Sequence, residues 1–104
     1  MENQDKKELI WVTEAGTDLI RIHNFLEVNA PLLTERIETL IEEKAEQLLI
    51  HPYMGKSMND GTGRRELTVR FGRGGYVIRY RLDPESEPKH IAILRVWHTR
   101  EHRD

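Results

Sequence analysis

The spacing of apolar residues changes once along the chain, and that change constrains the fold more than any other feature. Between Thr13 and Leu48 apolar side chains recur at intervals of three and four residues, the period of an α-helix with one buried face. From Arg65 to Leu82 they recur at every second residue, the period of a β-strand. A chain that places its helices before most of its strands in this way is typical of the α+β class.

Two helices are predicted in the first half of the chain. Thr13 is expected to cap the first helix, which runs to about Asn29. Pro31 favours the first position of a second helix, and Pro52 is expected to close it because proline disfavours helical geometry in the residue before it, His51. The short connection makes the two helices an antiparallel hairpin. The apolar face of the second helix is formed by Leu33, Ile37, Leu40, Ile41, Ala45 and Leu48.

Four strands are predicted around these helices, at residues 9–12, 65–71, 76–82 and 91–97. The last of them is apolar almost throughout, so we expect it to be a central strand buried on both faces for much of its length. In the third strand, the residues expected to face the core are Tyr76, Ile78, Tyr80 and Leu82.

The connections between these strands are predicted from their turn-forming residues. Residues 53–63 are expected to form an exposed loop, and the glycines within residues 72–75 are expected to supply the positive φ angles of a hairpin. The order β-α-α-β-β-β predicts an α+β fold in which a helical hairpin packs on one face of a mostly antiparallel four-stranded sheet. The other face of the sheet is left for a partner.

The length of 104 residues fits one compact domain. We expect a flexible lead at residues 1–8, a single domain at residues 9–101 and a short tail at residues 102–104. The absence of cysteine excludes a disulfide framework and a thiolate metal site. No apolar run is long enough to suggest a membrane span or an export signal, so we expect a cytoplasmic protein with no membrane partner.

Charge is distributed unevenly between the two halves. Residues 1–51 hold 5 Lys and Arg against 11 Asp and Glu, whereas residues 52–104 hold 11 against 7, so the halves carry −6 and +4. A basic surface on the second half attracts acidic partners, and both nucleic acid and an acidic peptide qualify.

Several local patterns in this order resemble the RelE/ParE toxin superfamily over about residues 9–101. The matching stretches are Trp11 with Glu14-Ala15 and Asp18-Leu19, Leu48 with His51-Pro52 and Gly55, Arg65-Glu66-Leu67, residues 76–81 and residues 93–98. The resemblance implies the bacterial toxin of a type II toxin–antitoxin or plasmid stabilisation system. Such a toxin is bound and silenced by a cognate antitoxin, which implies a toxin–antitoxin hetero-oligomer.

Two activities are known in that superfamily, and a shared fold does not choose between them. RelE-like members cut messenger RNA on the ribosome, and ParE-like members poison DNA gyrase. If the chain is RelE-like, the resemblance points to Arg65, Arg79 and Arg81 as cations for the phosphate and to His98 as general acid or base. The residues expected to bind a target or the antitoxin are Arg65, Arg70, Arg79, Arg81, Arg95, His98 and Arg100.

Two departures from the nuclease pattern favour a ParE-like toxin. Those nucleases commonly carry a tyrosine after the last strand, and this chain has none beyond Tyr80. They also tend to be strongly basic, whereas this chain has a net charge of −2 and a pI near 6.2. We therefore expect a gyrase inhibitor with no cofactor, an mRNA endoribonuclease as the alternative, and a non-toxic antitoxin-binding protein as a third possibility.

Structural explanations compete with each of these functional ones. Arg65 fits a cross-strand ion pair as well as a binding site, and Arg79 and Arg81 fit an ordinary solvated sheet face. His98 fits a structural histidine at the end of a buried strand, and with His102 it lacks the further ligand that a metal site needs.

Overall fold

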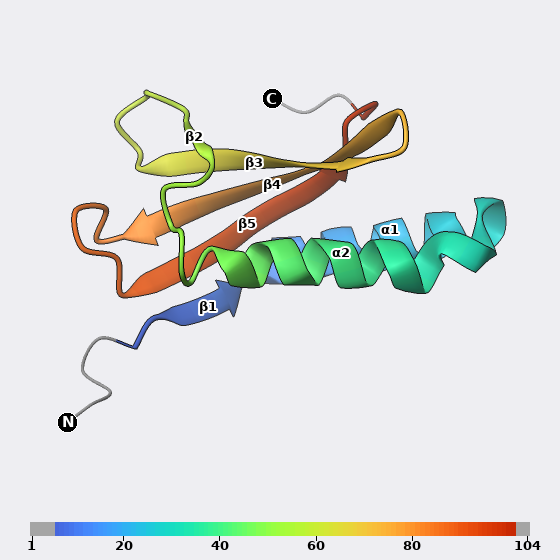
Figure 1. The fold of residues 1–104 in the computed structure, drawn as a ribbon, viewed down its shortest axis with the longest axis horizontal. Helices are drawn as coiled ribbons and strands as arrows, with labels where there is room; N and C mark the ends of the chain where they lie inside the picture. Colours follow the sequence, from blue (N-terminus) through green and yellow to red (C-terminus); the bar gives the residue numbers. More distant parts are fainter. Residues whose placement is uncertain (1–5, 102–104) are drawn as a thin grey trace.

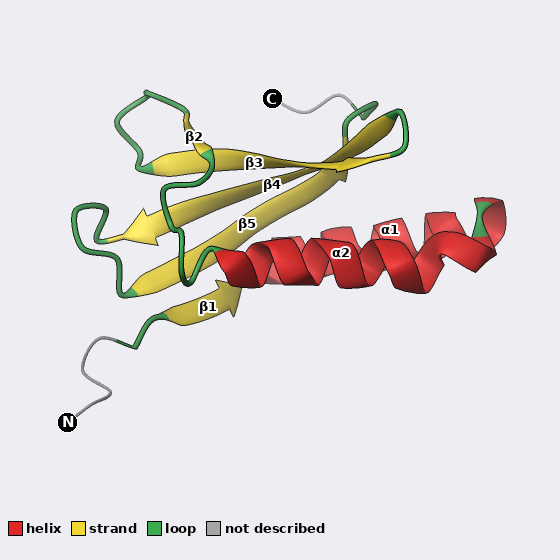
Figure 2. Cartoon of the chain, viewed as in Figure 1, coloured by secondary structure: helices red, strands yellow, loops and turns green. Residues whose placement is uncertain are grey.

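The computed structural model describes residues 6–101, which form two helices and five strands (Figures 1 and 2). In chain order the elements are β1 (Glu8–Trp11), α1 (Thr13–Asn29), the 3₁₀ turn η2 (Pro31–Leu33), α2 (Thr34–Gln47), β2 (Lys56–Ser57), β3 (Arg64–Phe71), β4 (Gly74–Asp83) and β5 (His90–His98). No helix within this range is long and apolar enough to cross a membrane.

The sheet has five strands in the order β1-β5-β4-β3-β2, and its strand directions are mixed. The pair β1–β5 is parallel, whereas the other three pairs are antiparallel. The predicted fold class is confirmed, with one strand more than expected. The extra strand is β2, which lies in the predicted loop 53–63 and pairs only Lys56 with Glu66 and Ser57 with Arg65. A strand of two residues leaves no periodic pattern in the sequence.

Helix α1 ends at Asn29, as predicted, but its start and both ends of α2 differ slightly from the prediction. Thr13 is the first residue of α1 and not its cap; Val12 is the N-cap, and its carbonyl accepts the first helical bond from the Gly16 amide. Helix α2 begins only at Thr34, after the 3₁₀ turn, and it ends at Gln47 rather than at His51. The amides of Leu48, Leu49 and Ile50 bond three residues back, which tightens the last turn, and the His51 amide then bonds the Gln47 carbonyl just before the proline.

The core lies between the helical hairpin and one face of the sheet. Tyr76, Ile78, Tyr80 and Leu82 of β4 are all buried there, as predicted. Of the predicted apolar face of the second helix, Ile37, Ile41, Ala45 and Leu48 are buried, and Leu33 and Leu40 are partly buried against this core. The Tyr80 hydroxyl donates to the Pro52 carbonyl and accepts from the Gly55 amide, each at 2.8 Å. A side chain at Gly55 would lie 2.7 Å from that hydroxyl oxygen, so glycine is required there.

A bulge in the β4–β5 pairing decides which face each residue of β5 occupies. Tyr80 pairs with Ile93 and Arg79 pairs with Arg95, so Leu94 is the extra residue. Ile93 and Val96 consequently both face the helices, although they are three residues apart. The last strand is internal, as expected, but β4 is the central strand. In the β3–β4 hairpin only Gly72 has a positive φ, of 60°, which fits the first position of a two-residue turn.

Candidate functional site

The arginines proposed from the sequence do not form one cluster, because β3 places Arg65 on the opposite face of the sheet from Arg79 and Arg81. Arg65 pairs across the strands with Tyr80, whose side chain lies in the core beneath the helices. Arg79 and Arg81 point to the face that the helices leave uncovered. The three arginines expected to surround a phosphate therefore do not share one face of the sheet.

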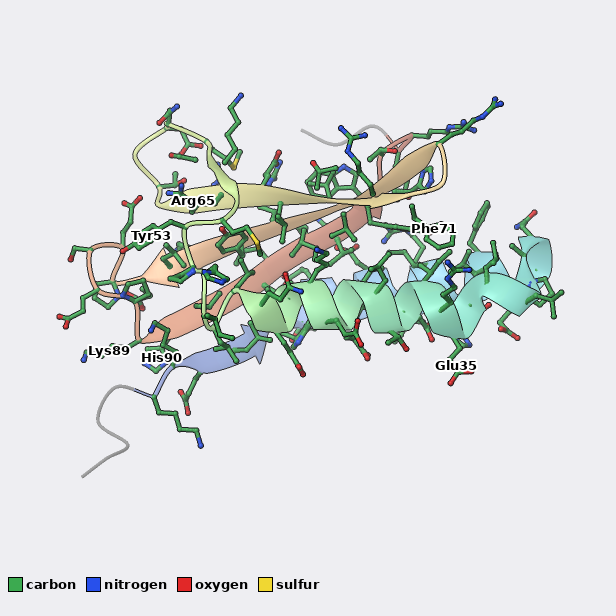
Figure 3. All side chains as sticks on the ribbon, viewed as in Figure 1. Glu35, Tyr53, Arg65, Phe71, Lys89 and His90 are labelled. Atoms are coloured by element: carbon green, nitrogen blue, oxygen red, sulfur yellow. The ribbon has the colours of Figure 1, made fainter. Side chains whose placement is uncertain are left out.

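Arg65 holds the segment that follows α2. Its Nε donates to the Gly55 carbonyl at 2.9 Å and its Nη2 to the Tyr53 carbonyl at 3.3 Å. The guanidinium also lies 5.5 Å from the centre of the Tyr53 ring, and Figure 3 shows the two side chains at the same end of the sheet. Glu85 lies 3.9 Å away as the nearest carboxylate. These contacts favour a structural role for Arg65. Its guanidinium anchors the segment after α2 through backbone carbonyls, whereas the sequence suggested a cross-strand ion pair.

Arg79 is bound by a carboxylate on the uncovered face of the sheet. Its Nε and Nη2 donate to one oxygen of Glu66 at 2.9 and 2.7 Å. The same guanidinium lies 4.9 Å above the ring of Trp97, which it covers. Only 11% of the Arg79 side chain is exposed, so its charge is balanced and largely shielded from solvent.

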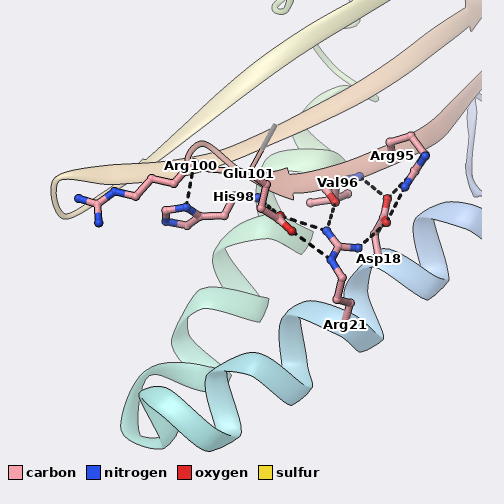
Figure 4. A network of polar contacts seen from close by, with 7 residues as sticks. All are labelled: Asp18, Arg21, Arg95, Val96, His98, Arg100 and Glu101. Carbon is pink, nitrogen blue, oxygen red and sulfur yellow. Dashed lines mark hydrogen bonds and ion pairs between the residues drawn. The ribbon is translucent and has the colours of Figure 1, made fainter. Parts of the chain in front are cut away.

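Arg95 takes part in a network centred on Asp18, which is only 2% exposed (Figure 4). The two oxygens of Asp18 accept from Arg95 at 2.8 and 3.1 Å, and they also accept from Arg21 and from the Val96 amide. Burial by itself raises the pKa of Asp18, but these donors together outweigh burial and leave that pKa below its ordinary value. Asp18 is therefore held as an anion within the fold.

The network continues from α1 to the turn after β5. Arg21 donates to both oxygens of Glu101 and to the Val96 carbonyl, at 3.1 to 3.2 Å. Glu101 in turn accepts from the His98 amide at 2.7 Å, and the Glu101 amide donates to the His98 carbonyl at 2.8 Å. The turn that carries Arg100 is thus fixed to the helix.

His98 lines a pocket of about 470 Å³ at this end of the sheet, together with Arg21, Ile22, Phe25, Tyr76, Arg100 and Glu101. Its Nδ1 accepts from the Arg100 amide at 3.1 Å, so the neutral ring carries its proton on Nε2. The Tyr76 ring meets the imidazole edge to face at 5.1 Å, and burial followed by the charge of Glu101 raises the pKa of the Tyr76 hydroxyl. The pocket combines a proton-carrying ring with one exposed arginine.

Three of the predicted binding arginines are exposed: Arg70, Arg81 and Arg100. Within residues 6–101 their guanidinium groups have no ion-pair or hydrogen-bond partner. The sequence did not lead us to predict that Asp18 binds Arg95, or that Asp18 and Arg21 bind the backbone of β5 at Val96. A signal was present, because Asp18 falls three residues after Ala15 and four before Ile22, inside the apolar stripe of α1.

No group of three or more metal-binding side chains occurs among the described residues. His102, which was considered as a ligand beside His98, lies outside that part of the chain.

Comparisons with known proteins agree with the fold. Residues 9–103 match the family of ParE toxins of type II toxin–antitoxin systems, parDE. Toxin RelE3 of Caulobacter vibrioides is 36% identical over 89 residues, covering 86% of this chain and 90% of that protein. Toxin RelE1 of the same organism is 34% identical over 89 residues, covering 86% and 89%.

A solved structure described as a chromosomal ParDE system from P. aeruginosa has the same fold. The TM-score is 0.73 at 23% identity, and the match covers 92% of this chain and 99% of that one. These comparisons agree with the order of elements described above. A family of this kind implies a cognate antitoxin as the partner. The chain belongs to the ParE toxin family, within the RelE/ParE superfamily of type II toxins.

Proposed function

We propose that this toxin acts by binding a protein target, DNA gyrase, and that its cognate antitoxin prevents this binding. The proposal rests on the observation that several of the candidate arginines are already bound by groups of this chain. Arg65 is bound to backbone carbonyls, Arg79 to Glu66 and Arg95 to Asp18. A ribonuclease needs cations available to the phosphate as charge develops on it, and two of the three arginines expected in that role, Arg65 and Arg79, are already engaged.

A carboxylate beside His98 supports the same conclusion. Glu101 lines the pocket with His98 and is held there by Arg21. Because Arg21 is bound to Glu101, Arg100 is the one cation among the described lining residues that is not already held by a carboxylate, which is fewer than a phosphate site usually offers. The modest net charge of the whole chain agrees with this preference.

The exposed arginines are the residues that we propose to contact the target. Arg70, Arg81 and Arg100 project from the sheet and from the turn after β5 without an ion-pair partner among residues 6–101. Exposed arginine is enriched among the residues that dominate protein interfaces, since it combines charge with a planar apolar surface.

A second candidate function is ribosome-dependent cleavage of messenger RNA, which the pocket around His98 favours. The Arg100 amide fixes the tautomer of the neutral imidazole, whose Nε2–H can then donate a hydrogen bond to a phosphate oxygen as charge develops there. Arg100 lines the same pocket as the nearest exposed cation. The RelE names of the two Caulobacter proteins are consistent with this alternative.

Induced expression without antitoxin distinguishes these functions by two readouts. We expect gyrase-dependent loss of plasmid supercoiling or broken DNA, with intact messages in primer extension. Alanine at Arg81 or Arg100 is expected to weaken the effect, whereas Lys89→Ala, an exposed cation outside the proposed surface, serves as the control. Cuts within translated codons and normal topology contradict the proposal and support the nuclease. Healthy growth leaves only the antitoxin-binding protein.

A further inference from the structure

Strand β1 forms one edge of the sheet, and within the described chain its only neighbouring strand is β5 (Figure 1). The Glu8 amide donates to the Lys89 carbonyl, so the backbone groups of Glu8 turn towards β5. In a parallel pair alternate residues bond the neighbouring strand, and the groups of Leu9 and Trp11 therefore point away from it. These outward amides and carbonyls have no partner among residues 6–101.

The side chains of β1 alternate between the two faces of the sheet. Leu9 and Trp11 are partly buried against the core, on the side of the helices. Ile10 lies on the uncovered face, where it pairs with Ala92 of β5 and remains 42% exposed. Native edge strands usually avoid an exposed apolar side chain beside unpaired backbone groups, because this combination invites another strand. The edge at β1 is therefore suited to strand pairing.

A hollow of about 310 Å³ adjoins this edge on the side of the helices, lined by Trp11, Leu19, Glu42 and Glu46. Trp11 and Leu19 are partly buried and supply an apolar surface. Glu42 and Glu46 are exposed, and neither has an ion-pair partner within residues 6–101. A strand that fits this hollow therefore presents an apolar side chain and a cation on the same face.

We propose that a second copy of this chain pairs with β1, antiparallel and about a twofold axis through Ile10. In this register the two Ile10 side chains lie opposite each other on the uncovered face and cover each other. Leu9 of each copy lies opposite Trp11 of the other, and their outward amides and carbonyls bond in pairs. The two sheets become one continuous sheet, with the helices of both copies on the same side.

Opposite charges meet in the same register. Lys7 is two residues before Leu9, so it shares the helix side of the edge with Leu9. Leu9 of the second copy therefore lies beside Trp11, at the apolar part of the hollow, and Lys7 of that copy lies next along the strand, towards Glu42 and Glu46. The twofold axis repeats both contacts. Lys7 has no ion-pair partner among the described residues of its own chain.

Neighbouring registers fit less well. A twofold axis through Leu9 would place the Glu8 carboxylate opposite the apolar Ile10, and an axis through Glu8 would place two carboxylates opposite each other. An axis through Trp11 would place Leu9 opposite Thr13, which already belongs to α1. The axis through Ile10 matches apolar with apolar side chains and leaves no like charges opposed.

The proposed pair does not depend on the identity of the target. Strands β5 and β4 separate β1 from β3, and a toxin that inhibits gyrase, cleaves messages or has lost its toxicity can pair in this way. An acidic segment of another protein fits the edge less well, because Glu42 and Glu46 would repel it. Each copy contributes a strand of only four residues, so we expect a weak dimer that dissociates on dilution.

Analytical ultracentrifugation of the full chain at increasing concentration tests the pairing. Ile10→Lys places two ammonium groups beside the axis and is expected to raise the dissociation constant of the dimer by about tenfold or more. Val28→Lys is the control, since Val28 is an apolar residue of α1 that is 81% exposed and lies away from the edge. It should change the constant by less than about threefold. Circular dichroism and urea unfolding establish that both variants are folded.

Two results of this experiment would overturn the proposal. One is a chain that stays monomeric up to about 1 mM. The other is a dimer that the two folded variants form equally well, because such a dimer uses another surface.

A mixing experiment tests the charge pairing between copies. One variant carries Lys7→Glu, and the other carries both Glu42→Lys and Glu46→Lys. Each variant alone opposes like charges at both symmetric contacts, so its dimer should be about tenfold weaker than that of the unaltered chain. In the mixed pair both contacts join opposite charges, and we expect the affinity to return to within about threefold of the original. A mixture that associates no better than either variant alone contradicts the proposal.

Amide hydrogen exchange on the unaltered chain locates the interface without a substitution. Exchange at Leu9 and Trp11 is expected to slow as the toxin concentration rises. Unchanged exchange at both amides while the dimer forms contradicts the proposal. Slowing that requires the antitoxin and does not depend on the toxin concentration assigns this edge to the antitoxin, which also contradicts it.

Discussion

The strands β5 and β3 differ in whether the backbone groups that point away from the sheet are hydrogen-bonded. Beyond Ile93, where β1 ends, the outward groups of Val96 and His98 are all bonded, to Asp18, Arg21 and Glu101. We call this the sealed edge. On β3, the corresponding groups of Thr68 and Arg70 have no partner within residues 6–101, and we call this the open edge.

This difference in backbone bonding indicates which edge stabilises the fold and which edge is available to a partner. Unpaired strand edges invite association with other chains, so a protein has reason to cover them. Here the cover on β5 comes from a helix and a turn of the same chain, and it is built from charged side chains. The open edge has no such cover within residues 6–101, and it lies beside a groove of about 940 Å³ between β3 and α2. The first edge therefore belongs to stability, and the second is available for binding.

The largest contrast is expected from placing proline at one outward amide of each edge. Val96→Pro removes the donor to Asp18 from a buried site and should cost about 3 kcal/mol or more of the free energy of unfolding. Thr68→Pro should cost less than about 1 kcal/mol, because the lost amide has no partner in the described chain. Urea unfolding measures both values, and equal losses would mean that the two edges do not differ.

The next largest effect on stability is expected from removing the Asp18 carboxylate at the centre of the sealed edge. Asp18→Ala leaves the Val96 amide unbonded and removes the partner of Arg95 and Arg21, which should lower the free energy of unfolding by about 2 to 4 kcal/mol. Asp60→Ala is the matched control, since Asp60 also binds an arginine, Arg64, but lies at the surface. A loss at Asp18 no greater than the control's argues against the network.

The pH dependence of stability sharpens the same point. The pKa of Asp18 is lower in the folded chain than the ordinary 3.8, so between the two values the unfolded chain binds more protons. Its contribution is full above about pH 3.8 and is lost as the pH falls through the lowered folded pKa. Urea midpoints measured at decreasing pH should fall in this window. Asp18→Asn should flatten that part of the curve, and an unchanged slope in the variant counts against the assignment.

The smallest effect is expected at the far end of the sealed edge. Glu101→Gln weakens the half-exposed contact with Arg21 and should cost less than about 1 kcal/mol. Amide exchange at His98 should nevertheless become faster, while exchange at Val96, which bonds Asp18, stays slow. Equal acceleration at both positions would show that Glu101 acts on the whole edge.

The elements themselves were predictable from the sequence because each has a strong period. The core face of β4 and the apolar face of α2 follow from spacing alone, and both are confirmed. The strand β2 was missed because two residues carry no period, and its pairing depends on where β3 lies in the folded chain.

The side-chain partners were not predictable in the same way. Arg65 and Arg79 look equivalent in the sequence, yet strand register places them on opposite faces of the sheet, one on carbonyls and one on Glu66. Asp18 reaches Arg95 from 77 positions away, a separation at which local spacing gives no information. The unexpected carboxylate in the apolar stripe of α1 was the available clue.

Backbone amide exchange of the toxin alone tests the contrast between the two edges most directly. The amides of Val96 and His98 should exchange slowly, and those of Thr68 and Arg70 should exchange faster by a factor on the order of a hundred. All four lie near the middle or the end of strands in one sheet, so the comparison is internal to a single sample. Similar rates at the four amides would contradict the distinction between a sealed edge and an open one.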